Sequence, residues 1–196
     1  MLFRSEAAAL KPAQDATPTN RAITDAARAV GAGHLGDAAA TEKAARDFEA
    51  DLAAVKKSNT AYTAITLEIP HDVVLAWQAF AKKDTAEALR LMRSAADRQD
   101  AAGDKGAGTP PREMLADMLI ELKRPQEALA EYETVLKYNP NRFNAIYGAA
   151  QAAELAQQQE KANGYYTQLV KLCGPETRST RPELATARAK TLMARK

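Results

Sequence analysis

The C-terminal half of this 196-residue chain repeats itself with a period of about 34 residues, which we call the short interval. A stretch further toward the N-terminus matches the first of these units at a long interval of about 40 residues. A glycine-rich segment around residues 100–110 absorbs the difference between the two intervals. Such periods indicate supersecondary units that bury their apolar faces only by stacking on one another, so the repeat predicts a stacked array. The matched positions include Ala116/Ala150, Ala128/Ala162, Tyr132/Tyr166 and Lys137/Lys171 at the short interval, and Ala76/Ala116 and Ala88/Ala128 at the long one.

The composition predicts that these units are helical. Alanine accounts for 44 residues, and Leu, Glu, Lys, Arg and Gln, which are also strong helix formers, are abundant. Prolines and glycines divide the chain into segments with short connections, which make successive helices antiparallel. We expect helices at about residues 20–31, 38–58, 71–82, 84–98, 111–123, 125–138, 142–157 and 159–173, with a last one from about 182.

Residues 111–140 (PREMLADMLIELKRPQEALAEYETVLKYNP) resemble the tetratricopeptide repeat. This stretch has Leu115 and Ala116 early in its first expected helix, Ala128 and Tyr132 in its second, and Pro140 at its end. The resemblance covers about residues 69–175, and residues 77–147 resemble bacterial tetratricopeptide proteins of uncharacterised role. It implies helix–turn–helix units in which an alanine lets two helices cross closely.

The fold class that follows is all-α. We expect a right-handed α-solenoid of antiparallel helix pairs, with about four pairs and a C-terminal capping helix. The expected organisation is a flexible segment 1–19, a degenerate helix pair 20–58, a repeat-like unit 69–98, a glycine-rich linker 99–110, repeat units 111–140 and 141–175, and a capping helix 182–196.

The resemblance implies a binding surface, because the first helices of such pairs line a concave groove. On this chain the groove would be acidic and aromatic, and would suit a basic or extended segment of a partner protein. An ordinary solvated helix face is the competing interpretation. The groove candidates are Glu113, Asp117 and Glu121 on one helix and Tyr147, Gln151 and Glu154 on the next.

Val73, Trp77 and Phe80 form an apolar stripe at helical spacing. We expect it to pack against the first helix pair. An exposed partner site or homodimer interface is the alternative, because exposed apolar stripes often mark interfaces. The basic C-terminal segment, with Arg188 and Lys190, is expected to cap the array rather than bind an anionic surface.

No sequence motif indicates catalysis, so we expect no enzyme, cofactor or metal site. The segment Gly31-Ala32-Gly33-His34-Leu35-Gly36 fits a dinucleotide-binding pattern, but a helical stretch precedes it where such a site needs a strand. It is interpreted as a turn between helices. His34 and His71 are the only histidines, whereas zinc sites usually need three or four ligands. Cys173 is interpreted separately as a small apolar residue.

These features predict a non-catalytic scaffold that binds a peptide or partner protein. The net charge of +2 argues against nucleic acid as the partner, and no apolar run is long enough to span a membrane. The alternative is a structural or dimerisation module in the C-terminal part of a larger, exported bacterial protein. No signal peptide is visible, so the expected compartment is the cytoplasm by default, or the periplasm or exterior if the chain is such a fragment.

Overall fold

The regular structure of the chain is α-helical wherever it is described. The computed structural model describes residues 2–58, 66–103, 108–174 and 177–194, with side chains from residue 5 onward. The chain divides into two compact units, Met1–Asp104 and Lys105–Lys196.

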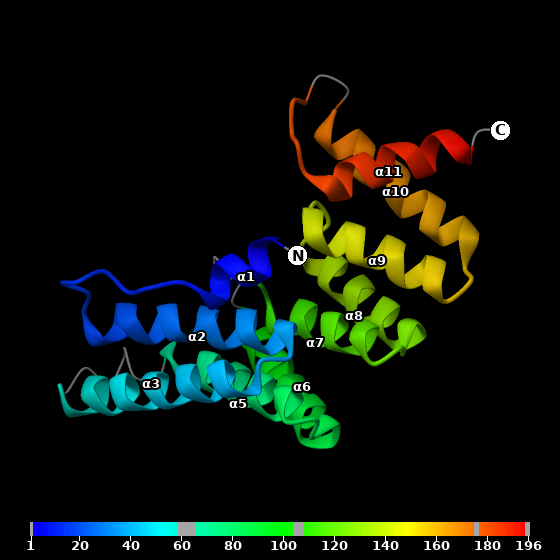
Figure 1. Ribbon diagram of the computed structural model, residues 1–196. Helices are drawn as coiled ribbons and strands as arrows, with labels where there is room; N and C mark the ends of the chain where they lie inside the picture. The colour runs from blue at the N-terminus through cyan, green and yellow to red at the C-terminus, as the bar shows by residue number, and fades with distance from the viewer. Residues whose placement is uncertain (1, 59–65, 104–107, 175–176, 195–196) are drawn as a thin grey trace. The chain divides into compact units, whose positions relative to one another are not determined.

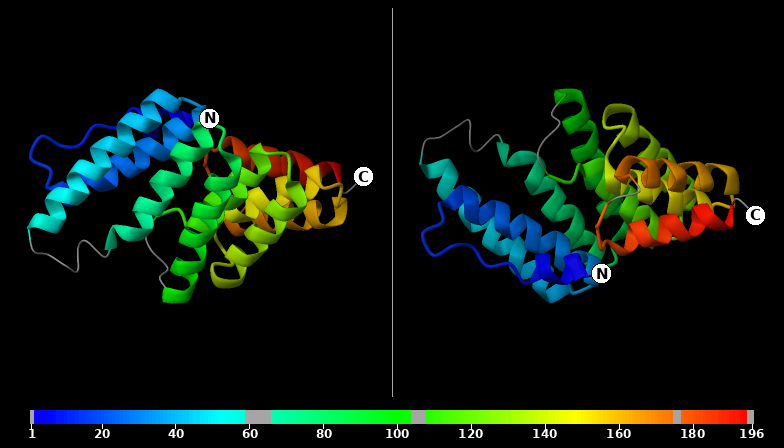
Figure 2. Two further views of the ribbon diagram at one scale, coloured as in Figure 1. Left: turned by 90° about the horizontal axis from the view of Figure 1, so that it is seen from below. Right: turned by 90° about the horizontal axis from the view of Figure 1, so that it is seen from above.

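The first unit is built from five described helices. These are α1 (Leu2–Ala8), α2 (Pro18–Leu35), α3 (Ala38–Lys57), α5 (Glu68–Ala81) and α6 (Thr85–Ala102). Helix α1 packs on α2, and α2 and α3 lie side by side along their lengths (Figures 1 and 2). Helix α5 packs on both of them and pairs with α6. The core between α2, α3 and α5 contains Phe48, Leu52 and Val74, all nearly inaccessible to solvent.

The second unit contains two helix pairs and a final helix. Its helices are α7 (Pro111–Glu121), α8 (Pro125–Tyr138), α9 (Phe143–Leu155), α10 (Gln159–Cys173) and α11 (Pro182–Met193). Helix α7 pairs with α8, and α9 pairs with α10. Helix α9 also packs on both members of the preceding pair, and α11 packs on α10. The α9–α10 pair therefore covers a face of the α7–α8 pair.

Helix starts follow the signals in the sequence. Pro111, Pro125 and Pro182 lie in the first turns of their helices, where a missing N–H removes no helical hydrogen bond. Asp84 caps α6, because its carboxylate accepts a hydrogen bond from the backbone N–H of Glu87 at 3.2 Å.

Four helix pairs are joined by the same turn. Its key residue has a left-handed backbone conformation, and this residue is Gly36 (φ 70°), Lys83 (φ 66°), Lys123 (φ 58°) or Gln157 (φ 59°). In each turn the N–H of this residue donates to the carbonyl three residues earlier. The next N–H donates to the carbonyl five residues before it, as in a Schellman cap. The turns at Lys83 and Lys123 are separated by the long interval and those at Lys123 and Gln157 by the short one, so the turns repeat in step with the matched alanines.

The matched alanines lie where helices pack. Six of them are completely buried, namely Ala76, Ala88, Ala116, Ala128, Ala150 and Ala162. Glycines permit even closer contacts at two helix positions. A Cβ atom on Gly33 would lie 2.7 Å from the Trp77 ring, and one on Gly148 would lie 2.3 Å from the Tyr132 ring.

Some expected boundaries were wrong. Helix α1 occupies part of the segment 1–19 that was expected to be flexible. The expected turn at residues 31–36 is confined to its end, because α2 continues to Leu35 and only Gly36 leaves the helix. Helix α5 begins at Glu68, since a proline is tolerated in the first turn. Helix α6 extends to Ala102, into the expected linker, and residues 59–65 and 104–107 lie outside the described part.

Candidate functional site

The predicted groove residues Glu113 and Asp117 on α7 are engaged inside the second unit. Glu113 is only 2% exposed and forms an ion pair with Arg142, which precedes α9. Burial raises the pKa of the Glu113 carboxyl, while the guanidinium of Arg142 acts against this rise. Asp117 accepts a hydrogen bond from the hydroxyl of Tyr132 on α8. These two acids therefore connect helices of the unit. Glu113 is buried, so the expectation that it lines a binding groove was wrong, whereas for the half-buried Asp117 it stays a prediction.

Two of the three candidates on α9 have partners as well. Glu154 accepts a hydrogen bond from the Tyr166 hydroxyl at 2.9 Å and forms an ion pair with Lys190 on α11. The hydrogen bond from Lys190 lowers the pKa of the Glu154 carboxyl. Tyr147 is partly buried against Tyr166, with ring centroids 6.3 Å apart at an angle of 62°. Burial raises the pKa of the Tyr147 phenol.

The remaining candidates, Glu121 and Gln151, are exposed. Leu155, one turn beyond Gln151 on α9, is 59% exposed, although sequence reasoning did not single it out. Its match to Glu121 at the short interval could have identified it. We call the exposed side chains of Glu121, Gln151 and Leu155 the α7–α9 surface. It carries one acid, one amide and one apolar side chain.

The apolar stripe belongs to the core of the first unit. Val73, Trp77 and Phe80 are 5%, 0% and 9% exposed, and the Trp77 ring lies 4.0 Å from the ring of His34 on α2. Packing against the first helix pair is confirmed. The alternative of an exposed interface was wrong, because Gly33 lets the indole sit directly against the α2 backbone.

The two histidines lie apart in different packing environments. The Nε2 atom of His71 contacts the Glu49 carboxylate, and the imidazole stacks on the Phe48 ring with the two ring centroids 5.8 Å apart. Within the described residues, no three His, Cys, Asp or Glu side chains gather as a metal ion would require. None of the described helices combines the length and apolar character needed to cross a membrane.

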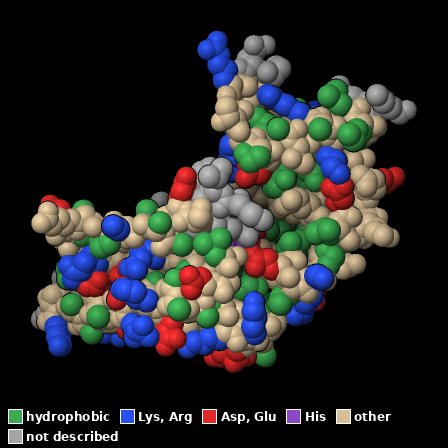
Figure 3. Space-filling model, in the orientation of Figure 1, with side chains coloured by type: hydrophobic (Ala, Val, Ile, Leu, Met, Phe, Trp, Pro, Cys, Tyr) green, Lys and Arg blue, Asp and Glu red, His purple; other side chains and the backbone are tan. Residues whose placement is uncertain are grey.

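An ion-pair network joins α2 to α3 and was missed in the sequence. Arg21 contacts Asp51 through two nitrogen atoms, at 2.9 Å and 2.5 Å from the same carboxylate oxygen. Arg28 bridges Asp25 and Asp47 at 2.6 Å and 3.2 Å. Burial raises the pKa of Asp25, which is 3% exposed. Opposite charges accordingly intermingle over these two helices in Figure 3, a pattern that favours a structural role.

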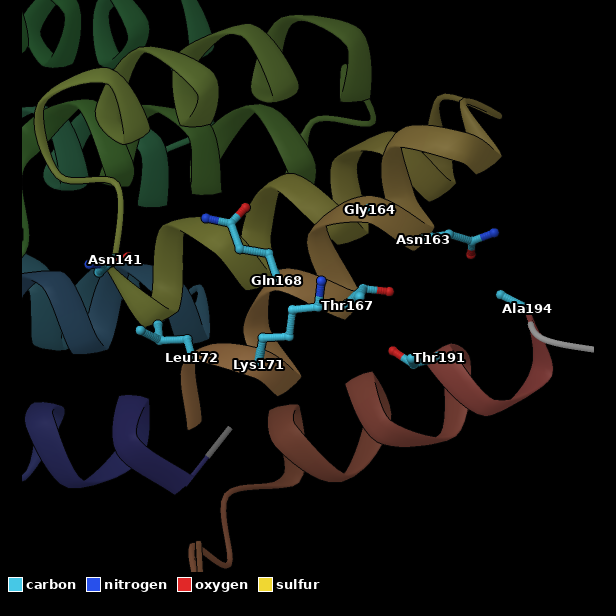
Figure 4. A pocket seen from close by; sticks show the side chains of 9 residues that line it. All are labelled: Asn141, Asn163, Gly164, Thr167, Gln168, Lys171, Leu172, Thr191 and Ala194. Carbon is cyan, nitrogen blue, oxygen red and sulfur yellow. The ribbon is translucent and has the colours of Figure 1, made fainter. Parts of the chain in front are cut away.

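A second feature missed in the sequence is an open groove between α10 and α11 (Figure 4). Its volume is about 800 Å³. Thr167 and Lys171 lie along α10, and Thr191 faces them from α11. The match between Lys171 and Lys137 was visible in the sequence, but nothing there indicated that a groove forms beside it.

No protein-family model matches this chain, and no curated protein matches it either. The tetratricopeptide resemblance therefore rests on the residues quoted above.

Proposed function

We propose that this chain is a non-catalytic scaffold of the tetratricopeptide type and that it binds an extended segment of another protein on the α7–α9 surface. The observation that carries the proposal is the repeated turn at Lys83, Lys123 and Gln157, with the same hydrogen bonds at the long and then the short interval. Within the second unit, the pairs joined at Lys123 and Gln157 pack with α9 against both α7 and α8, and stacked repeats of this kind create extended binding surfaces.

The proposed contacts differ from those expected from the sequence. Glu113 is buried in its ion pair with Arg142, and Asp117 is partly buried against Tyr132, so neither carboxylate is exposed to a partner as Glu121 is. Glu121, Gln151 and Leu155 are exposed side chains of the same two helices. An amide and a carboxylate beside an apolar side chain suit a segment that offers backbone N–H groups, a basic residue and one apolar anchor.

A display library of random peptides presented to the full chain tests this proposal. We expect enriched peptides with a basic residue near an apolar one. Their affinity should fall by about tenfold or more in the Glu121→Arg/Gln151→Arg variant, equivalent to at least about 1.4 kcal/mol. Thr167→Arg, which adds an arginine to a different face of the unit, is the matched control and should leave binding unchanged. Equal affinity for the wild type and the double variant would overturn the proposal.

A further inference from the structure

The groove between α10 and α11 lies on the face of α10 that corresponds to the face of α8 contacted by side chains of the next helix pair. On α8, Glu133 accepts hydrogen bonds from Lys161 at 2.9 Å and Tyr165 at 3.1 Å, both on α10. The carbonyl of Pro140, just after α8, accepts a third from Gln168 at 3.1 Å. Side chains of α10 therefore reach this face of α8. At the short interval, Glu133 corresponds to Thr167, which lines the groove on α10.

Helix α11 contacts α9 as the first helix of a further pair would. Lys190 on α11 pairs with Glu154 on α9, and Arg181 lies 3.8 Å from the centroid of the Phe143 ring. In the preceding pair, α9 reaches back to α7 in the same way through Arg142 and Glu113. Helix α9 has α10 as its partner, whereas no further helix follows α11 among the described residues. The groove occupies the position of that second helix.

Gly164 supports helix docking at this place. It lies within α10, and a Cβ atom built on it would meet nothing within 4 Å. Gly33 and Gly148, by contrast, each accommodate an aromatic ring that no larger residue would admit. A glycine inside a helix lowers stability by about 1 kcal/mol relative to alanine. No described residue fills the space above Gly164, but a helix crossing α10 there would.

The charge of the groove indicates the chemistry of the docked helix. Lys171 is the one charged side chain in its lining, is exposed, and makes no ion pair among the described residues. Leu172, 41% exposed, supplies an apolar contact at the same end. A second copy bound through this groove would bring a second lysine and no acid, because a two-fold interface uses the same patch twice.

We propose that this groove docks an amphipathic helix of a partner protein, with its small residues against Gly164 and an acidic side chain against Lys171. This site is separate from the α7–α9 surface and does not depend on it.

Two synthetic peptides test the inference on the full 196-residue chain. Both have 15 residues, the length of α10, and are held helical by a cross-link on their outer face. One contains Ala, Leu and Glu, and the other has Lys in place of each Glu. Affinity is measured by fluorescence anisotropy and location by backbone amide NMR shifts. We expect the acidic peptide to bind about tenfold tighter or better, with shifts centred on Gly164, Thr167 and Lys171.

Three variants locate the binding. Thr167→Arg should weaken the acidic peptide by about tenfold or more, because the new side chain fills the groove. Lys171→Glu should reverse the preference between the two peptides. Ala130→Arg, at an exposed position on α8 outside both proposed surfaces, is the matched control and should bind as the wild type does. Circular dichroism checks that each variant keeps its helical content.

Equal affinity for both peptides, shifts centred outside the groove, or an unaffected Thr167→Arg variant would each overturn the proposal. Sedimentation velocity of the chain alone adds a further outcome. A dimer that Thr167→Arg abolishes would assign the groove to a second copy of the chain and refute the assignment to an acidic partner helix.

Discussion

Replacing Gly148 with alanine tests the packing between the helix pairs of the second unit. Gly148 lies within α9, and a Cβ atom there would approach the Tyr132 ring on α8 to 2.3 Å and its hydroxyl oxygen to 2.8 Å. No side-chain rotation at alanine can relieve this overlap, so the ring or the helix must move. If the ring moves, the hydrogen bond from Tyr132 to Asp117 is disturbed as well.

The size of the effect follows from three contributions. Alanine is favoured over glycine in a helix by about 1 kcal/mol. Overpacking costs about 1–3 kcal/mol, and a hydrogen bond to a charged group is worth about 1.5–3 kcal/mol. We therefore expect Gly148→Ala to lower the free energy of unfolding by about 2–4 kcal/mol. Gly164→Ala, at an open helix position, should raise it by up to about 1 kcal/mol.

Urea unfolding followed by far-ultraviolet circular dichroism measures the free energy of unfolding of both variants, which is compared for the transition of the second unit. Both glycines lie within α-helices of one unit, so the gain in helix propensity is the same in Gly148→Ala and Gly164→Ala and cancels when the two are compared. In a Tyr132→Leu background, Gly148→Ala should no longer be destabilising, since the ring that it meets is gone. If Gly148→Ala is as stable as Gly164→Ala in the wild-type background, the reasoning about close packing is refuted.

Three further changes test other features of the fold. Ala128→Leu should lower the free energy of unfolding by about 1–3 kcal/mol, because Ala128 is completely buried. Ala130→Leu, at an exposed position, should have little effect. Equal melting temperatures of the two variants would contradict the close helix crossing at Ala128. Lys123→Gly should raise the free energy of unfolding, measured by urea titration, by about 0.5–1 kcal/mol. The reason is that the strain of a left-handed lysine exceeds the extra conformational entropy that glycine loses on folding. A lower free energy of unfolding would contradict this reasoning. The hydrogen bond from Lys190 lowers the pKa of the Glu154 carboxyl from its ordinary value of 4.5. The stability that this ion pair contributes is therefore complete above pH 4.5 and is lost as the pH falls through the lowered pKa. Glu154→Gln should flatten this part of the profile of unfolding free energy against pH, and an unchanged slope would refute the coupling.

The helices were predictable because their signals are local. Proline at a helix start, aspartate at a cap and glycine after a last turn act within about one helical turn of their own position. The turns at Lys83, Lys123 and Gln157 were not predictable in detail, because lysine and glutamine carry no preference for a left-handed backbone. Their positions follow from the packing of the two helices that each turn connects.

The candidate site was predicted less well, because the spacing along a helix identifies a face but not what lies against it. Glu113 and Asp117 share a face with Glu121, yet the first is buried against Arg142, which lies 29 residues further along the chain. The same limitation applies to Trp77, whose apolar spacing suited either a core or an interface.

The amino-acid sequence by itself determined the helical class, the approximate helix positions and the two repeat intervals, because propensity, capping and repetition are properties of neighbouring residues and of matching positions. Only the tertiary structure decided which charged groups remain exposed and where a helix face is left uncovered. Burial and ion pairing depend on residues that are distant in the sequence, and the groove beside Lys171 exists because of how α10 and α11 meet.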